Sequence, residues 1–200
     1  MLRNFQDVLS NAAGYGRVKI SVAVAQDKDV LQALKLAHDA GLSEPVLVGD
    51  AAAIRPLLSE VGLPTDTTVV DEPDINKAAL AAVELVHNGT ADVVMKGLVN
   101  TSDFLKALLN AGVGLRTGRL LSHLAAFEVP GESRLIFHSD GGMNIAPTLA
   151  EKKDIPSEIV YRRIDEEKVE GFVDFIIPER SAVAMKPLFE KKKKEKEDDE

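Results

Sequence analysis

Along the first 110 residues, short apolar runs alternate with longer segments whose apolar residues recur every three or four positions. The short runs are rich in valine and small residues, which is typical of buried strands. They predict strands at residues 18–25, 46–48, 67–70 and 92–95. The longer segments predict amphipathic helices at residues 5–13, 28–40, 51–61, about 73–87 and 103–110.

Polar residues and glycines mark the ends of these predicted helices. Asp27 and Asp50 stand where a side-chain oxygen can cap a helix N-terminus, and Gly41 and Gly62 stand where a helix can end. For the helix over residues 103–110, Thr101 or Ser102 is expected to be the opening residue.

The alternation of strands and helices predicts an α/β fold with a mainly parallel sheet and helices on both faces. In such sheets, ligands bind at the carboxyl ends of the strands. We therefore expect function in the segments after Ala25, Val48, Val70 and Met95, and in the loop of residues 111–122.

Further strands are predicted in the second half of the chain. Two strands are predicted at residues 122–129 and 134–137, joined by a turn at Pro130 and Gly131, and a further strand at 171–177. We expect one α/β domain over residues 1–154, a segment of unknown structure over 155–190, and a disordered charged tail over 191–200.

Composition narrows the class of protein. A hydrophobic content of 45% is enough for a core, and a net charge of −8 argues against a nucleic-acid partner. The chain has no cysteine, which excludes disulfides and thiolate chemistry. No signal peptide or membrane-spanning run is recognisable. We therefore expect a cytoplasmic protein without a membrane partner.

Two segments carry candidate chemistry. Residues 93–101 (VVMKGLVNT) place Lys96 and Gly97 after a strand and before a helix, where the ammonium and the free N–H groups of the helix can converge on an anion. Residues 112–119 (GVGLRTGR) combine three glycines with two arginines, and Arg116 can grip phosphate oxygens. A surface lysine beside a turn and a flexible connecting loop are the alternative interpretations.

The histidines show no metal-ligand spacing. His38 and His87 fall near helix C-termini, where we expect structural roles, and His123 and His138 fall in or beside strands. No cluster of metal ligands is recognisable, so no metal is expected. The residues alone predict an α/β domain with a candidate anion site at Lys96, Thr101 and Arg116.

The same segments resemble a known family. Residues 22–27 (VAVAQD), 45–50 (PVLVGD), 76–110 and 113–130 (VGLRTGRLLSHLAAFEVP) are similar to the phosphate acetyl/butyryltransferases, with the butyryl-specific members most similar. The resemblance covers residues 1 to about 154. It implies a first domain like that of the isocitrate and isopropylmalate dehydrogenases.

The resemblance also implies an activity: reversible transfer of a short acyl group, butyryl favoured, between coenzyme A and phosphate. It implies no metal or other cofactor, acyl-CoA and phosphate as partners, and a homo-oligomer. Arg116 and Thr101 are the implied catalytic residues. The implied substrate-binding residues are Lys96, Gly97, Asn100, Lys106 and Ser122.

The resemblance to the family ends before the C-terminal part of the chain. Family members continue into a second domain and return with a segment that carries Ser, Arg and Asp, and this chain shows neither. The alternative is therefore a catalytically inactive CoA- or phosphate-binding, or oligomerisation, domain. A dehydrogenase of related fold would need metal-binding aspartates, and no convincing set is present.

Overall fold

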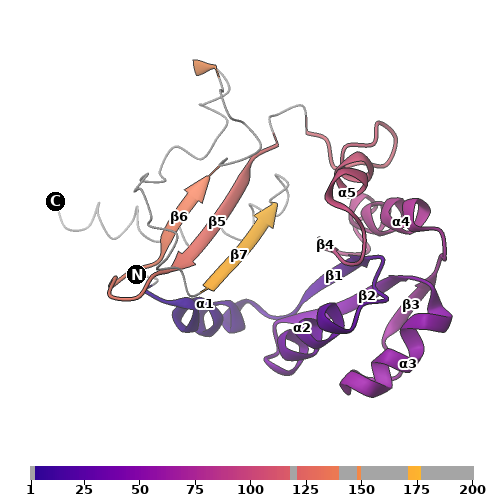
Figure 1. Cartoon of the computed structure of the whole chain (residues 1–200), viewed down its shortest axis with the longest axis horizontal. Helices are drawn as coiled ribbons and strands as arrows, with labels where there is room; N and C mark the ends of the chain where they lie inside the picture. The colour runs from indigo at the N-terminus through magenta and orange to yellow at the C-terminus, as the bar shows by residue number, and fades with distance from the viewer. Residues whose placement is uncertain (1–2, 118–120, 140–147, 150–170, 177–200) are drawn as a thin grey trace. The chain divides into compact units, whose positions relative to one another are not determined.

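A computed structural model describes residues 3–117, 121–139, 148–149 and 171–176 (Figure 1). The chain divides into two compact units, one of Asn11–Arg116 and one of Met1–Ser10 with Thr117–Glu200. This division falls inside the stretch 1–154 that the sequence predicts as one domain. The predicted boundaries at residues 154 and 190 lie outside the described residues.

The unit Asn11–Arg116 is built on a parallel sheet of four strands. They are β1 (Val18–Ala23), β2 (Ser43–Gly49), β3 (Thr68–Asp71) and β4 (Val93–Lys96), in the spatial order β3-β2-β1-β4. β1 pairs with both β2 and β4, with Val22 opposite Leu47 on one side and opposite Met95 on the other. The predicted parallel sheet is confirmed.

Four helices cover the two faces of this sheet (Figure 1). They are α2 (Lys28–Asp39), α3 (Ala51–Val61), α4 (Ile75–His87) and α5 (Thr101–Leu108). α2 packs against α3, and α4 packs against α5. Right-handed crossovers explain this pairing: the chain moves one way from β1 to β3 and then turns back to β4, which places α4 on the opposite face.

The two faces are packed with different residues. On the α2 and α3 face, Val22 and Leu47 contact a cluster of fully buried leucine and isoleucine side chains. On the α4 face, the buried helix residues are small: Ala78, Ala79, Ala82 and Val83. Each large buried side chain contributes about 1.5–3 kcal/mol relative to an exposed one.

Side-chain caps begin the helices. Asp27 accepts a hydrogen bond from the Val30 amide at 3.0 Å, and Asp50 accepts one from the Ala52 amide at 2.9 Å, as predicted. α5 begins at Thr101, as predicted, and Asn100 before it is the cap: its Oδ1 accepts from the Asp103 amide at 3.0 Å. Asn, Thr and Ser follow one another here, and all three are good caps, so the local sequence could not decide.

The other unit is described in less detail. β5 (His123–Glu128) pairs antiparallel with β6 (Ile136–Ser139) and β7 (Gly171–Ile176). The predicted turn at Pro130 and Gly131 lies between β5 and β6, and β6 begins two residues later than the predicted 134.

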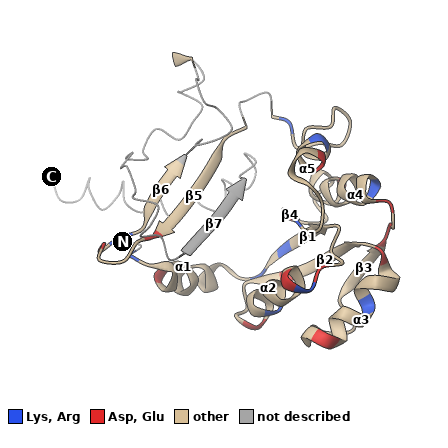
Figure 2. Ribbon diagram, viewed as in Figure 1, with Lys and Arg blue, Asp and Glu red and all other residues tan. Residues whose placement is uncertain are grey.

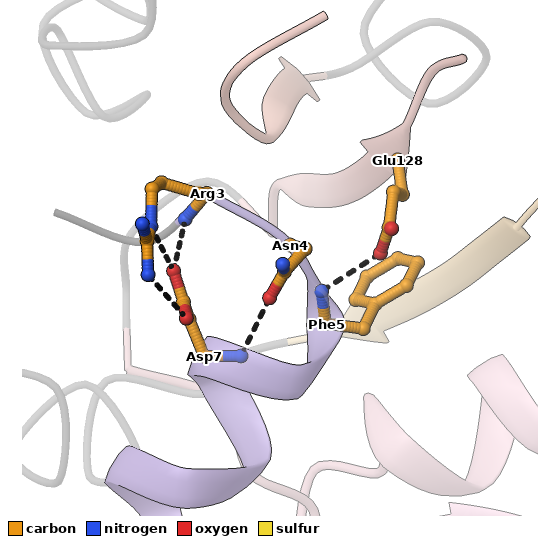
Figure 3. A network of polar contacts seen from close by, with 5 residues as sticks. All are labelled: Arg3, Asn4, Phe5, Asp7 and Glu128. Atoms are coloured by element: carbon orange, nitrogen blue, oxygen red, sulfur yellow. Dashed lines mark hydrogen bonds and ion pairs between the residues drawn. The ribbon is translucent and has the colours of Figure 1, made fainter. Parts of the chain in front are cut away.

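The N-terminal helix α1 (Phe5–Ala12) belongs in part to this unit. The first amide of α1 is bound by a residue far along the sequence. Glu128 accepts a hydrogen bond from the Phe5 N–H at 2.8 Å, beside the Arg3–Asp7 ion pair (Figure 3). A polar cavity of about 260 Å³ lies next to these contacts. Its walls come from residues 3–4 and 128–133.

Candidate functional site

The sheet has a topological switch point between β1 and β4. The connection from β1 leads to β2 on one side, whereas β4 lies on the other side. Connections that leave in opposite directions open a crevice outside the carboxyl ends of the two strands, where ligands bind in open α/β sheets. β4 ends in Lys96 at this position, so the predicted segment 96–101 lies at the edge where a ligand is expected.

The backbones after β1 and β4 are joined at the switch point. The Gly97 amide donates to the Ala23 carbonyl at 2.9 Å, and the Leu98 amide donates to the Val24 carbonyl at 2.8 Å. A Cβ added at Gly97 would stand 2.7 Å from the Ala23 oxygen and closer still to the Val24 oxygen. Only glycine fits here, because both neighbours are backbone atoms.

Val24 is strained. It is fully buried and has a φ of +59°, a left-handed conformation that a β-branched residue rarely adopts. Such conformations cost about 1–3 kcal/mol and persist where the surrounding structure imposes them. The strain turns the Val24 carbonyl toward the Leu98 amide.

Lys96 folds back over its own loop. Its Nζ donates to the Val99 carbonyl at 2.7 Å and lies 3.4 Å from the Gly97 carbonyl. The ammonium therefore stabilises the turn between β4 and α5. Two of its three donor directions point at these carbonyls, and one is left for another acceptor.

A network of polar side chains covers the first turn of α5. Besides the Asp103 amide, Asn100 Oδ1 accepts from the Ser102 hydroxyl at 2.8 Å, and Asn100 Nδ2 donates to Asp103 Oδ2 at 2.6 Å. Lys106 Nζ donates to Asp103 Oδ1 at 2.7 Å, and these basic and acidic positions are neighbours on α5 (Figure 2). The hydrogen bond from Lys106, followed by that from Asn100, lowers the pKa of the Asp103 carboxyl.

The cap of α5 differs from those of the other three helices of the sheet. α2, α3 and α4 are capped by the carboxylates of Asp27, Asp50 and Asp74, whereas α5 is capped by the neutral amide of Asn100. A carboxylate at the cap repels a second anion and satisfies the helix dipole. The cap of α5 itself therefore does not repel an anionic ligand, although Asp103 in the first turn adds one negative charge nearby.

The structure does not bring Arg116 to this end of α5. The Leu115 amide donates to the Leu108 carbonyl at 2.8 Å, and the Gly114 carbonyl accepts from His87 Nδ1 at 3.1 Å. These contacts tie the loop to the last turn of α5, roughly 12 Å along the helix axis from its start. The Arg116 side chain is exposed there.

The remaining predicted residues lie as follows. Lys96, Gly97, Asn100 and Thr101 share the switch-point edge, and the exposed Lys106 lies one turn further along α5. Ser122 is half-buried and belongs to the other compact unit. The roles of all these residues stay predictions.

Two features of the site were missed from the sequence. The strain at Val24 leaves no local signal, because it depends on contacts with residues 97–98 that are distant in the chain. The Asp103–Lys106 pair does leave one, since a three-residue spacing places two side chains on one face of a helix.

Within the described residues, no group of three His, Cys, Asp or Glu side chains is arranged to hold a metal ion. His38 and His87 both lie in last helical turns. None of the described helices is both long and apolar enough to cross a membrane.

Fold and site together define a doubly wound α/β domain with a glycine-containing turn at its switch point. The family model described as "Phosphate acetyl/butaryl transferase" matches residues 65–169, slightly more than half of the chain. The chain belongs to this family.

Individual relatives agree with this assignment. A phosphate butyryltransferase of Clostridium acetobutylicum is 44% identical over 161 residues, which are 80% of this chain and 54% of that protein. A phosphate acetyltransferase of Thermotoga maritima is 35% identical, over 75% of this chain and 51% of the relative.

Among solved structures, a branched-chain phosphotransacylase from Enterococcus faecalis V583 is similar, with a TM-score of 0.56 and 28% identity. That match covers 69% of this chain and 48% of the other. The chain thus spans about half the length of the curated relatives it matches.

Proposed function

We propose that the protein is a phosphate acyltransferase that moves a short acyl group reversibly between coenzyme A and inorganic phosphate. The observation that carries the proposal is the 44% identity to a phosphate butyryltransferase over 161 residues. The same family model includes the switch-point segment 96–101.

In the proposed reaction, a phosphate oxygen attacks the carbonyl carbon of the thioester. The carbon–sulfur bond breaks, the acyl phosphate forms, and coenzyme A leaves as a thiolate that takes up a proton. The thioester is already activated, so the proposed chemistry uses neither a metal nor a prosthetic group. The site must hold two anions together and stabilise the carbonyl oxyanion.

The proposed roles follow the charges and donors at the switch point. The Thr101 hydroxyl and the neighbouring amides donate to phosphate oxygens. The Lys96 ammonium, which has a third N–H for another acceptor, adds a positive charge. Gly97 lets the backbone approach closely, and Asn100 positions the first turn of α5. Lys106 and Ser122 are proposed to contact phosphate or coenzyme A. Arg116, whose loop lies at the far end of α5, is proposed as the electrostatic clamp on the larger ligand, coenzyme A.

We propose butyryl over acetyl as the acyl group, because the butyryltransferase relative is more similar than the acetyltransferase relative. A homo-oligomer in the cytoplasm is part of the same proposal.

The test is release of CoA thiol from butyryl-CoA and acetyl-CoA, with and without phosphate, in the full chain and in Arg116→Ala. Phosphate-dependent release that the substitution abolishes is the expected result. Correctly folded chain that releases no thiol would refute it. That outcome favours a non-catalytic domain that binds CoA or phosphate.

A further inference from the structure

We infer that Leu98 is a specificity-determining residue, whose side chain contacts the acyl chain of the thioester substrate. The inference rests on the proposed function, because it concerns the same switch-point site. It gives a role to a residue that carries no charge and has no side-chain hydrogen-bond donor.

Leu98 is exposed in a turn where exposed and buried residues alternate from Lys96 to Asn100. Its side chain is 54% exposed, whereas Gly97 before it and Val99 after it are buried. A single exposed leucine needs no explanation by itself. Leu36, 73% exposed on the surface of α2, is such a case.

What distinguishes Leu98 is how firmly its backbone is held. Its amide donates to the carbonyl of the strained Val24 at 2.8 Å, and the Val99 amide donates to the Gly97 carbonyl at 2.9 Å. On the other side, Lys96 Nζ holds the Val99 carbonyl at 2.7 Å. A residue fixed by a strained neighbour, a close-packed glycine and a lysine nevertheless keeps its apolar side chain in solvent.

The chemistry of the substrate matches this arrangement. A short acyl thioester has a polar carbonyl beside an apolar tail, and the carbonyl must lie next to the phosphate. Leu98 stands between the Lys96 ammonium and the Asn100 cap along the chain. A tail laid on Leu98 would therefore keep its carbonyl beside the donors. Burial of one CH₂ group changes an equilibrium about four-fold, so a contact with two CH₂ groups separates butyryl from acetyl substrates.

The experiment compares Leu98→Ala and Leu98→Met with Leu36→Ala in the full chain. The kcat/KM for phosphate-dependent CoA release is measured with acetyl-, propionyl- and butyryl-CoA. Leu98→Ala is expected to lower the butyryl value about five- to ten-fold and the acetyl value less than two-fold. Leu98→Met is expected to retain the preference, and Leu36→Ala to change nothing. Equal losses for all three substrates, or no loss, would overturn the inference.

The affinities for butyryl-CoA and for free CoA are also measured by calorimetry. They show whether the inference about Leu98 fails or the proposed function fails. A chain without turnover refutes the proposed enzyme. The inference about Leu98 then stands only if butyryl-CoA binds more tightly than CoA and Leu98→Ala removes the difference. Equal affinities, or no binding of either ligand, would overturn it as well.

Discussion

Gly97 shows how one position can be restricted to a single residue. Its missing Cβ is what allows the turn after β4 to lie against the backbone after β1. We expect Gly97→Ala to lower the free energy of unfolding by about 1–3 kcal/mol, the usual range for overpacking. Gly14→Ala is the matched control, because nothing lies within 4 Å of an added Cβ there. Urea unfolding of both variants checks this, and equal midpoints would contradict the close packing at Gly97.

Asp103 carries a negative charge in the first turn of α5. Its replacement by asparagine removes repulsion of an incoming anion and frees Lys106. We expect Asp103→Asn to bind inorganic phosphate roughly two- to five-fold more tightly, the factor typical of one charge at a helix end. Phosphate titration followed by NMR at neutral pH measures this. Unchanged or weaker binding would indicate that phosphate does not bind at this helix end.

The same substitution gives a pH signature. Because hydrogen bonds lower the pKa of Asp103 below its ordinary 3.8, the folded state favours the carboxylate. The stabilisation from these bonds is therefore complete above the ordinary pKa and is lost as the pH falls through the lower, folded value. The stability difference between wild type and Asp103→Asn should be constant at neutral pH and shrink below pH 3.8.

At the residue scale, the sequence is informative where the cause is local. Asp27 and Asp50 cap helices whose first amides lie three or fewer residues away, so their roles could be predicted. The conformation of Val24 could not, since valine favours strands and only the amide of Leu98, 74 positions later, explains the positive φ.

At the element scale, substitutions at the cap of α5 are expected to affect stability and anion binding differently. Asn100→Ala removes the acceptor for the Asp103 amide and should cost about 0.5–2 kcal/mol of unfolding free energy. Asn100→Asp keeps an acceptor for the Asp103 amide but loses the hydrogen bond from Asn100 Nδ2 to the Asp103 carboxylate, so it should recover only part of the stability that Asn100→Ala loses. Its negative charge should nevertheless weaken phosphate binding.

Thermal unfolding and phosphate titration of the two Asn100 variants together check this prediction. An Asn100→Asp variant that is no more stable than Asn100→Ala would contradict the capping role. An Asn100→Asp variant that binds phosphate as well as wild type would contradict an anion site at α5.

Element boundaries depart from the sequence prediction where pairing decides them. β2 spans Ser43–Gly49, although only residues 46–48 read as a strand, because Val18–Ile20 of β1 extends the ladder to Ser43–Pro45. β1 ends at Ala23 and not at residue 25, since Val24 turns away to meet Leu98. Partners from elsewhere in the chain set both limits.

At the scale of the whole molecule, the alternating pattern predicts a parallel sheet but not its strand order. The order β3-β2-β1-β4 creates the switch point. It places α4, whose buried residues are small, on the face opposite α2 and α3. Residues 96–101 could be named as a candidate site from sequence. That they lie beside the strained end of β1 required the fold.

The division of the chain into two compact units after residue 116 leads to a final prediction. The unit Asn11–Arg116 contains the complete β3-β2-β1-β4 sheet, its four helices and the core around Val22 and Leu47. A fragment of residues 11–116 should therefore fold alone and unfold cooperatively, since its apolar core does not depend on the other unit. It should also bind phosphate in the way the full chain does, because Lys96, Asn100 and Thr101 all lie within it. Circular dichroism in urea and a phosphate titration measure these properties. A fragment without a cooperative transition would mean that the two units form one core, and a folded fragment that loses phosphate would place the anion site partly in residues 117–200.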